Sequence, residues 1–390
     1  MNSPISITSF ASISALGNSP EEVWNSYLNI NKHYITLEDF SGLSTPVSKL
    51  QIQGTESLHE LANNATHYKN LDRSVLMGIL VAKQAFNASG WSSNDHFGIN
   101  MGSSRGATEL FEKYHQEFIT TGKTSTLSSP TTTLGNISSW IAHELQSKGP
   151  EISHSITCST ALHSVLNGVA WINSGLTKKF IVGGSEAPLT PFTVAQMRAL
   201  KIYATQVNEE YPCRTLDFEK QRNQMFLGEG AAVFCLEEGI AKNAKALITG
   251  IGYGTEVLKH NISISANADC FQTSMKMAIG NTPLSKIDAI VMHAPGTIKG
   301  DSSEYNAVNK IFENQVPLLT SNKWKIGHSF GASGALSMEL ALLMLQHQKF
   351  IPVPFIENKN SEKPLRTILV NAVGFGGNAV TIKIEKTNLD

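Results

Sequence analysis

Cys158 lies in a run of mostly small hydroxyl residues, 155–160, that leads into a predicted helix. From Ala161 to Ile172 apolar side chains recur at helical spacing, and Gly175 is a typical helix end. We expect Cys158 to be the first residue of that helix, where free backbone N–H groups and the helix dipole favour a thiolate. A thiolate attacks a thioester carbonyl readily and leaves again easily. Because a lone buried cysteine is more often a small structural hydrophobe, the other motifs must decide its role.

Three later segments combine chemically active side chains with glycine-containing turns. They contain His293 followed by Thr297, Asp301 and Glu304; Lys323 followed by Gly327 and His328; and Phe375 beside Gly376 in the loop 374–377. A histidine at the end of a strand is more often a structural, hydrogen-bonded residue, so no segment is specific alone. Two desolvated, neutral imidazoles could together donate N–H groups to the oxyanion of an enolate.

In their order and spacing these segments resemble the β-ketoacyl-acyl-carrier-protein synthases, the Cys-His-His condensing enzymes of the thiolase fold, over essentially the whole chain. The nucleophile of that family lies in a Cys-Ser-Ser/Thr-Ala turn, which matches residues 158–161. Its first histidine has an aspartate eight residues later, as His293 and Asp301 do. A lysine precedes a Gly-His pair at 327–328, and a Gly-Phe-Gly-Gly loop lies near the end, at 374–377.

The resemblance implies a role for each of these residues. Cys158 would carry an acyl group, and His293 and His328 would stabilise the enolate formed when a malonyl group on an acyl carrier protein loses CO₂. The amides of Cys158 and Phe375 would form the oxyanion site of the acyl thioester, with the glycines around Phe375, including Gly376, letting its ring act as a gate.

Three further residues take supporting roles in the same comparison. Lys323 and Glu304 would form a buried ion pair that braces the histidine loops, with Asp301 as a further support. Thr297 would bind the pantetheine arm of the carrier.

The chain departs from the family pattern at three of the matched positions. Ala294 and Pro295 stand where the family has the glycine and the first threonine of a His-Gly-Thr-x-Thr loop, and Val373 stands where it has an aromatic residue. These departures leave the substrate range open between ordinary fatty acid synthesis and a specialised polyene, pigment or polyketide pathway.

Strands and helices alternate along the chain, which predicts an α/β fold. The triplet Lys-Phe-Ile occurs twice, at 179–181 and at 349–351. Its phenylalanine lies 22 residues after Cys158 in the first case (180 − 158) and 22 residues after His328 in the second (350 − 328). We therefore predict two pseudo-symmetric halves, residues 1–240 with the cysteine and 241–390 with the two histidines. The resemblance implies the five-layered α-β-α-β-α arrangement of the thiolase fold, as a homodimer or a heterodimer with a related subunit.

Composition excludes several other classes of function. Lys and Arg number 31 against 32 Asp and Glu, so no basic excess predicts nucleic-acid or membrane-surface binding. No basic segment precedes the apolar N-terminus, and no run approaches 18 apolar residues, so we expect neither a signal peptide nor a membrane span. Four widely spaced cysteines without a CxxC pair predict free thiols and a cytoplasmic protein. The chemistry requires no metal and no cofactor.

Two alternatives remain open from the sequence. Gly102-Ser103-Ser104-Arg105-Gly106 is a G-x-S-x-G motif between a predicted strand and helix, so Ser104 could be the nucleophile of a serine hydrolase. That alternative leaves Cys158, His328 and Phe375 without a role. The other alternative is a catalytically weak partner subunit, like the chain-length factors that pair with ketosynthases, although such subunits usually lack the cysteine.

Overall fold

Two five-stranded sheets with the same connectivity form the centre of the computed structural model, which describes residues 3–134, 136–204, 210–257, 264–357 and 362–387. The first sheet has the order β5-β4-β6-β8-β1 and the second β11-β10-β12-β13-β9. In both sheets the first two pairings are parallel and the last two antiparallel. The strands of the first sheet are β1 (Ile5–Ile13), β4 (Gly98–Gly102), β5 (Glu151–His154), β6 (Lys179–Glu186) and β8 (Gly230–Glu238). Those of the second are β9 (Ala246–Thr255), β10 (Ala289–Val291), β11 (Leu318–Thr320), β12 (Thr367–Gly374) and β13 (Asn378–Glu385).

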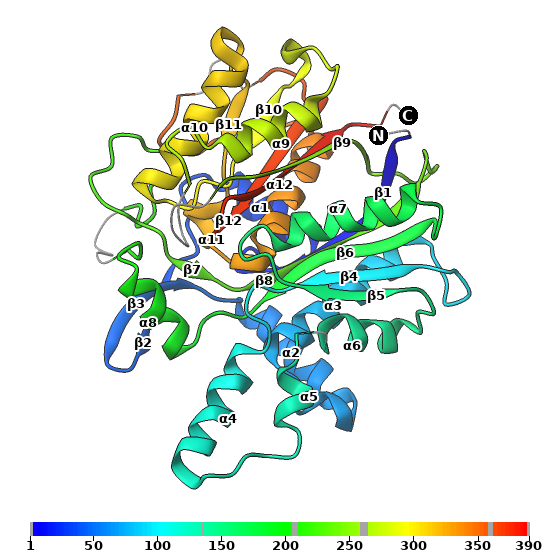
Figure 1. The fold of residues 1–390 in the computed structure, drawn as a ribbon, viewed down its shortest axis with the longest axis vertical. Helices are drawn as coiled ribbons and strands as arrows, with labels where there is room; N and C mark the ends of the chain where they lie inside the picture. Colours follow the sequence, from blue (N-terminus) through cyan, green and yellow to red (C-terminus); the bar gives the residue numbers. More distant parts are fainter. Residues whose placement is uncertain (1–2, 135, 205–209, 258–263, 358–361, 388–390) are drawn as a thin grey trace.

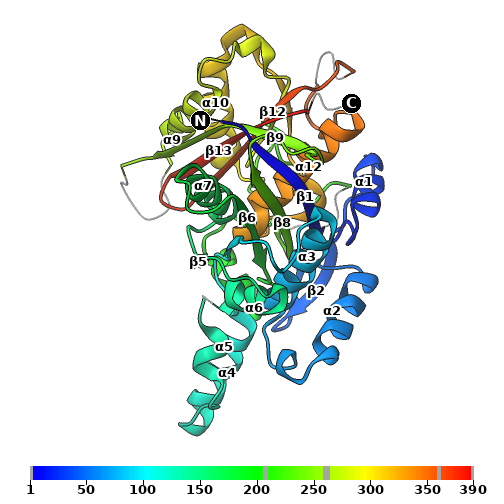
Figure 2. The same ribbon diagram turned by 90° about the vertical axis from the view of Figure 1, so that its right-hand side faces the viewer.

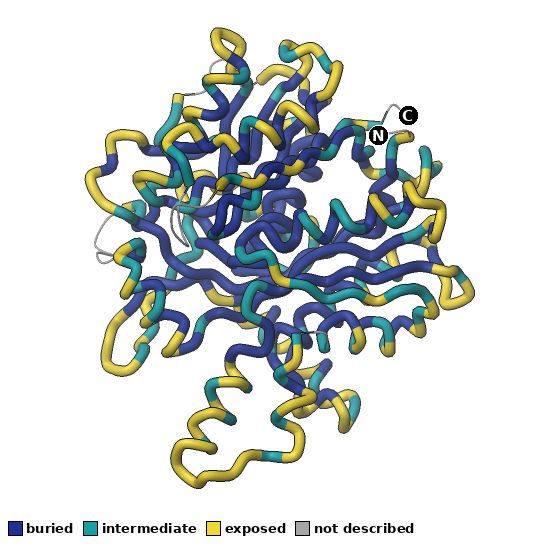
Figure 3. Tube along the Cα trace, viewed as in Figure 1, coloured by how far each residue is buried: buried dark blue, intermediate teal, exposed yellow. Residues whose placement is uncertain are grey.

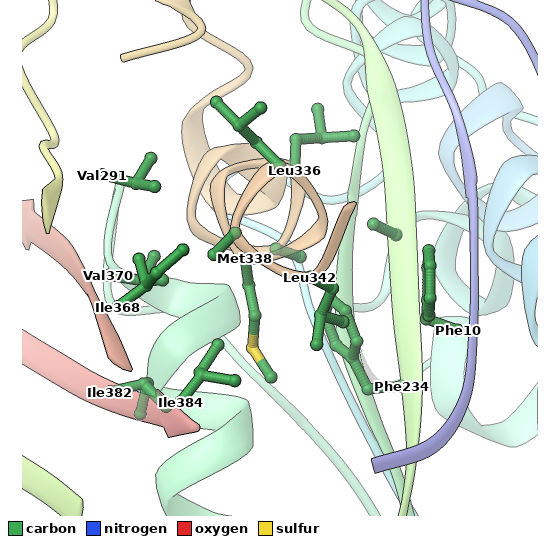
Figure 4. Close-up of a cluster of buried hydrophobic side chains, with 14 of the residues drawn as sticks. Phe10, Phe234, Val291, Leu336, Met338, Leu342, Ile368, Val370, Ile382 and Ile384 are labelled. Atoms are coloured by element: carbon green, nitrogen blue, oxygen red, sulfur yellow. The ribbon is translucent and has the colours of Figure 1, made fainter. Parts of the chain in front are cut away.

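Two helices fill the space between the sheets, α7 (Thr160–Asn173) and α12 (Ser333–His347) (Figure 1). Residues 333–345 of α12 are all buried, and a helix that is apolar on nearly every side belongs in a core. In Figure 4 Met338 points toward Ile384 of the second sheet, whereas Leu342 lies beside Phe234 of the first. One hydrophobic core therefore joins both halves.

Two more helical layers cover the outer faces of the sheets. Against the first sheet lie α3 (Arg73–Ser89) and α6 (Asn136–Leu145), and against the second lie α9 (Asp269–Ile279) and α10 (Ile298–Phe312). The Asp72 side chain caps α3 by accepting from the Ser74 amide. The five layers confirm the α-β-α-β-α prediction. We propose the boundary of the halves at residue 240, between β8 and β9.

The remaining elements lie around the sheets. They are α1 (Pro20–Leu28), β2 (Thr36–Phe40), β3 (Leu43–Ser48), α2 (Ile52–Asn64), α4 (Thr108–Thr121), α5 (Ser128–Thr132), α8 (Pro191–Ala199), β7 (Leu227–Gly228) and α11 (Lys323–Ile326). Helices α4 and α5 project from the body (Figure 2), and α4 is largely exposed, unlike the sheets (Figure 3). Within the described ranges, no helix is long and apolar enough to cross a membrane.

Candidate active site

Cys158, His293 and His328 line one pocket of about 290 Å³, although 170 residues separate the first from the last in the sequence (328 − 158). The two imidazole rings lie 5.1 Å apart between centroids, with their planes at 88°. Phe375 and Thr297 line the same pocket. Four other predicted residues lie outside its wall in the described structure: Lys323, Glu304, Asp301 and Gly376.

Cys158 is held in a tight turn between β5 and α7. Thr157 before it has φ of +47°, a left-handed conformation that a β-branched residue rarely adopts. The Thr160 hydroxyl closes the turn, because it accepts from the Ile156 amide at 2.8 Å and donates to the Thr157 carbonyl at 2.5 Å. The turn leaves Cys158 only 5% exposed, with that exposure directed into the pocket.

The sequence-based prediction that Cys158 is the first residue of the following helix is wrong. Helix α7 begins at Thr160, two residues after the cysteine, so Cys158 is not its first residue. Burial, and after it the charge of the Glu186 carboxylate, raise the pKa of the Cys158 thiol to about 12. The charges of Arg105 and Lys323 act in the opposite direction. In this state the sulfur is a thiol at neutral pH, and it must lose its proton as it attacks.

His293 follows β10 and is positioned through its backbone by Glu304 on α10. The Glu304 carboxylate accepts from the amides of His293 at 3.0 Å and Ala294 at 2.9 Å, and from the Asn371 side chain at 3.0 Å. Ala294 has φ of +20°, so the chain turns sharply at this point. Burial raises the pKa of Glu304 to about 7. This carboxylate thus ties the histidine loop to α10 and β12.

His328 is fixed on the other side of the pocket by the segment that contains β7. Its amide donates to the Phe226 carbonyl at 2.8 Å, and its own carbonyl accepts from the Gly228 amide at 3.2 Å. Gly327 before it has φ of +68°, and a Cβ there would lie 2.7 Å from the Phe226 ring. Glycine is therefore required immediately before the catalytic candidate.

Both imidazoles are neutral at physiological pH. Burial lowers the pKa of His328 to about 3 and that of His293 well below its ordinary value, and the Lys323 charge adds to both shifts. The Nδ1 atoms of both rings are buried without a hydrogen-bond partner among the described residues. Each neutral ring carries one N–H that can be donated to an oxyanion.

The predicted direct ion pair between Lys323 and Glu304 is not formed. The Lys323 ammonium donates to Asn322 Oδ1 at 3.0 Å and to Ser337 Oγ at 3.1 Å, whereas the Glu304 carboxylate is occupied by three N–H donors. Burial lowers the pKa of Lys323 to about 8, and Glu304 opposes this shift from a longer range. Two neutral partners, Asn322 just before α11 and Ser337 on α12, thus hold a buried cation whose charge acts on both histidines.

Asp301 supports the loop after His293 through a partner that the sequence analysis missed. Its carboxylate forms a buried ion pair with Lys220 at 2.8 Å, and it also accepts from the amides of Gly296 and Leu216. Thr297 is the N-cap of α10, where its hydroxyl accepts from the Gly300 amide at 3.1 Å. The lysine lies 81 residues from its partner, so no local sequence pattern could predict the pair.

The closing loop connects β12 and β13 and packs directly against the nucleophile turn. A Cβ on Gly374 would overlap Thr157 Oγ1 and would lie 2.8 Å from the Ile156 carbonyl. Gly376 and Gly377 have φ of +97° and +68°, so the reversal after Phe375 depends on glycines. The expected proximity of this loop to Cys158 is present.

The structure gives the G-x-S-x-G motif a bracing position. Its Ser104 and Arg105 amides donate to Glu186 at 2.6 and 3.1 Å, and Ser103 Oγ does so at 2.9 Å. The same carboxylate accepts from the Gly331 amide, which ties the motif to the start of α12. Of the described residues, Ser104 is not among those that line the pocket with the histidines. The serine hydrolase alternative gains no support.

Family models match the chain in two consecutive parts. The "Beta-ketoacyl synthase, N-terminal domain" matches residues 2–240, and the "Beta-ketoacyl synthase, C-terminal domain" matches residues 245–356.

Relatives and solved structures agree with these matches. The 3-oxoacyl-[acyl-carrier-protein] synthase 2 of Coxiella burnetii is 26% identical over 406 residues, which is 97% of this chain and 98% of the relative. The protein of the same name from Vibrio cholerae is 27% identical over 404 residues, which is 95% of this chain and 96% of the relative. The solved structure of the ishigamide ketosynthase/chain length factor superposes with a TM-score of 0.85 at 20% sequence identity. A β-ketoacyl synthase from Burkholderia phymatum superposes with a TM-score of 0.83 at 19% sequence identity. Each superposition covers 99% of this chain and 100% of the other chain. The fold, the ordered motifs and the family matches together show that the chain belongs to the β-ketoacyl synthase family.

Proposed function

We propose that the protein is a 3-oxoacyl-acyl-carrier-protein synthase, an acyltransferase that joins an acyl group to a malonyl unit with loss of CO₂. The observation that carries this proposal is the pocket shared by Cys158, His293 and His328, in which one thiol faces two neutral imidazoles. The family matches across both halves of the chain support the same function.

In the first half-reaction the Cys158 sulfur attacks the carbonyl of an acyl thioester. The bond between that carbonyl and the sulfur of the carrier breaks, and the carrier thiol leaves with the proton that Cys158 gives up. The backbone amides of Cys158 and Phe375 are the proposed donors to the oxyanion of this step. The packing of the closing loop against Thr157 supports their proximity.

In the second half-reaction a malonyl thioester occupies the pocket and loses CO₂. The electron pair of the broken carbon–carbon bond forms an enolate, and the N–H groups of His293 and His328 stabilise its oxygen. The enolate carbon then attacks the acyl carbonyl on Cys158, the carbon–sulfur bond breaks, and the cysteine sulfur takes up a proton. A neutral imidazole serves in this step because it keeps one N–H that it can donate to the enolate oxygen.

The proposed partner is an acyl carrier protein that delivers both the acyl and the malonyl groups. The curated relatives are named for that carrier, and one structural neighbour is described as a type II polyketide synthase acyl-carrier protein in complex with its ketosynthase. Another is described as a ketosynthase in complex with its chain length factor. We propose a homodimer or a heterodimer with a related subunit, acting in the cytoplasm.

The pathway is proposed as fatty acid or polyene and polyketide biosynthesis. Thr297 remains the proposed contact of the pantetheine arm, because it lines the pocket beside Pro295 while capping α10. Ala294 and Pro295, in place of the usual glycine and threonine, and Val373 in the pocket wall favour a specialised substrate range. Condensation of ordinary saturated acyl carriers at housekeeping rates would rule out this specialisation.

The test separates the enzyme from a catalytically weak chain-length-factor-like subunit. The purified protein is incubated with an acyl carrier protein loaded with a short acyl group, and its intact mass is followed before malonyl carrier is added. The enzyme gains one acyl mass at Cys158 and then forms a 3-oxoacyl carrier, and the Cys158→Ala variant does neither. Absence of both, with and without a candidate partner subunit, would overturn the proposal.

A further inference from the structure

The loop from Gly102 to Gly106 is wedged between the two chemically active segments. On one side, the Ser155 hydroxyl donates to the Ser104 carbonyl at 3.0 Å, and a Cβ on Gly102 would overlap Thr160 Cγ2. On the other side, Glu186 accepts from the loop amides and from the Gly331 amide at 2.9 Å. The loop therefore touches both the turn that holds Cys158 and the segment that follows His328.

The Arg105 guanidinium extends from this loop toward the pocket wall. It lies 5.1 Å from the centre of the Phe330 ring, and its Nη1 donates to Gln196 Oε1 at 2.6 Å. Both contacts are with neutral groups, and no carboxylate forms an ion pair with Arg105 in the part of the chain that the structure describes. Its positive charge is therefore not neutralised by a direct partner.

Phe330 links this cation to the catalytic candidates. Its ring lines the pocket and meets the His328 ring edge to face, with centroids 5.5 Å apart and planes at 69°. Its backbone has φ of +38°, which costs free energy for a residue with a side chain and which the surrounding contacts must sustain. A guanidinium against its face adds a cation–π contact that holds the ring in place.

Three charged groups act on the Cys158 sulfur from three different elements. Glu186, at the end of β6, disfavours its ionisation, whereas Arg105 and Lys323 of α11 favour it. The imidazoles of His293 and His328 face the same pocket in their neutral form. Arg105 and Lys323 are therefore the side-chain cations that favour the thiolate.

We propose that Arg105 is a positioning residue of the condensing site, which stabilises the Cys158 thiolate during acyl transfer and holds Phe330 against His328. The inference rests on the proposed function only in taking Cys158 as the nucleophile. As the thiol proton leaves, negative charge develops on the sulfur in a region with little water, where a nearby cation acts strongly. Removing this cation therefore lowers the fraction of thiolate at a fixed pH.

The test measures thiolate formation without any acyl substrate. Full-length protein is treated with iodoacetamide between pH 7 and 9.5, and modification of Cys158 is followed by peptide mass mapping, which separates it from the other three cysteines. The variants Arg105→Met and Arg105→Gln both remove the positive charge, and the glutamine retains an N–H donor for Gln196. The variant Arg105→Lys keeps the positive charge. Arg198→Met is the matched control, because that guanidinium stacks on Tyr203 at 5.8 Å and donates to Thr45.

We expect alkylation of Cys158 to be about tenfold slower at each pH in the two neutral variants, within threefold of wild type in Arg105→Lys, and unchanged in the control. If one neutral variant fails to fold, as judged by near-UV circular dichroism, the other decides. Wild-type alkylation in a folded neutral variant would overturn the proposal, as would a lysine variant as slow as the neutral ones. Because no carrier is involved, these results stand apart from the condensation assay, whose failure alone would overturn the proposed function.

Discussion

Replacing Glu304 by glutamine keeps the shape of the side chain but removes part of the support of His293. The carboxylate accepts from three N–H donors, two at Oε1 and one at Oε2. A glutamine has one carbonyl oxygen, so in its best orientation its NH₂ group faces the Ala294 amide, and that amide and the NH₂ group are two buried donors without an acceptor. Such a change shifts the backbone of His293, and a displacement near 1 Å of a catalytic group costs roughly a hundredfold in rate.

The pH dependence of stability follows from the raised pKa of Glu304. Between its ordinary value of 4.5 and its folded value of about 7, the native state keeps a proton that the unfolded chain has lost. Stability contributed by this group therefore falls as the pH rises through that interval, by about 1.4 kcal/mol per pH unit and about 3 kcal/mol in all. The glutamine variant lacks this decline, so its stability relative to wild type improves from pH 5 to pH 8.

Activity has the opposite dependence, because the ionised carboxylate accepts all three donors and the protonated form does not. We expect release of CO₂ from malonyl carrier by the wild type to rise between pH 6 and 8, and Glu304→Gln to be ten- to a hundredfold slower at pH 8 without that rise.

Glu339→Gln is the matched control for this experiment. Glu339 is equally buried, with a pKa also raised to about 7, but it lies within α12 and accepts from Ser12. It should reproduce the stability change, measured by urea unfolding at pH 5 and 8, and leave the activity profile unchanged. A wild-type rate and pH profile in Glu304→Gln would refute the assigned role of this carboxylate.

Three other substitutions test separate parts of the site. Gly374→Ala should slow acylation of Cys158 by at least about tenfold, because the new Cβ overlaps Thr157. Acylation is followed by intact mass, and a near-normal rate would show that the loop can move without affecting the site. Asp301→Asn should lower the free energy of unfolding by about 3 kcal/mol in urea titrations, since it leaves the buried Lys220 ammonium without its partner; a change under 1 kcal/mol would contradict that reasoning. Ser104→Ala should keep wild-type condensation, and its loss would revive a role for that serine.

Most of the architecture could be predicted because its signals are local and repeated. Alternating strands and helices predict the layers, and the equal spacing after Cys158 and His328 predicts the equivalence of α7 and α12, which share the middle layer. The boundaries were less accurate where turns intervene. Helix α7, expected to begin at Cys158, begins at Thr160.

The candidate site was predictable in its residues but less so in its contacts. Spacing and motif order identify Cys158 and the two histidines, yet no motif assigns a role to Glu186, Arg105 or Phe330. Their importance arises from contacts between segments that are distant in sequence, such as Glu186 with Gly331, 145 residues apart.

Two predictions were wrong, the helix start at Cys158 and the direct Lys323–Glu304 pair. The apolar spacing of a helix does not fix its first residue, and the residue types of an ion pair do not reveal the competing hydrogen-bond partners.

The central claim is that two imidazoles act on one enolate oxygen beside an acylated cysteine. The most direct measurement is release of labelled CO₂ from malonyl carrier by His293→Ala and His328→Ala, with acylation of Cys158 followed by mass in the same samples. We predict that each variant loses decarboxylation by roughly a hundred- to a thousandfold while Cys158 still takes up an acyl group. Decarboxylation at the wild-type rate in either folded variant would contradict the account.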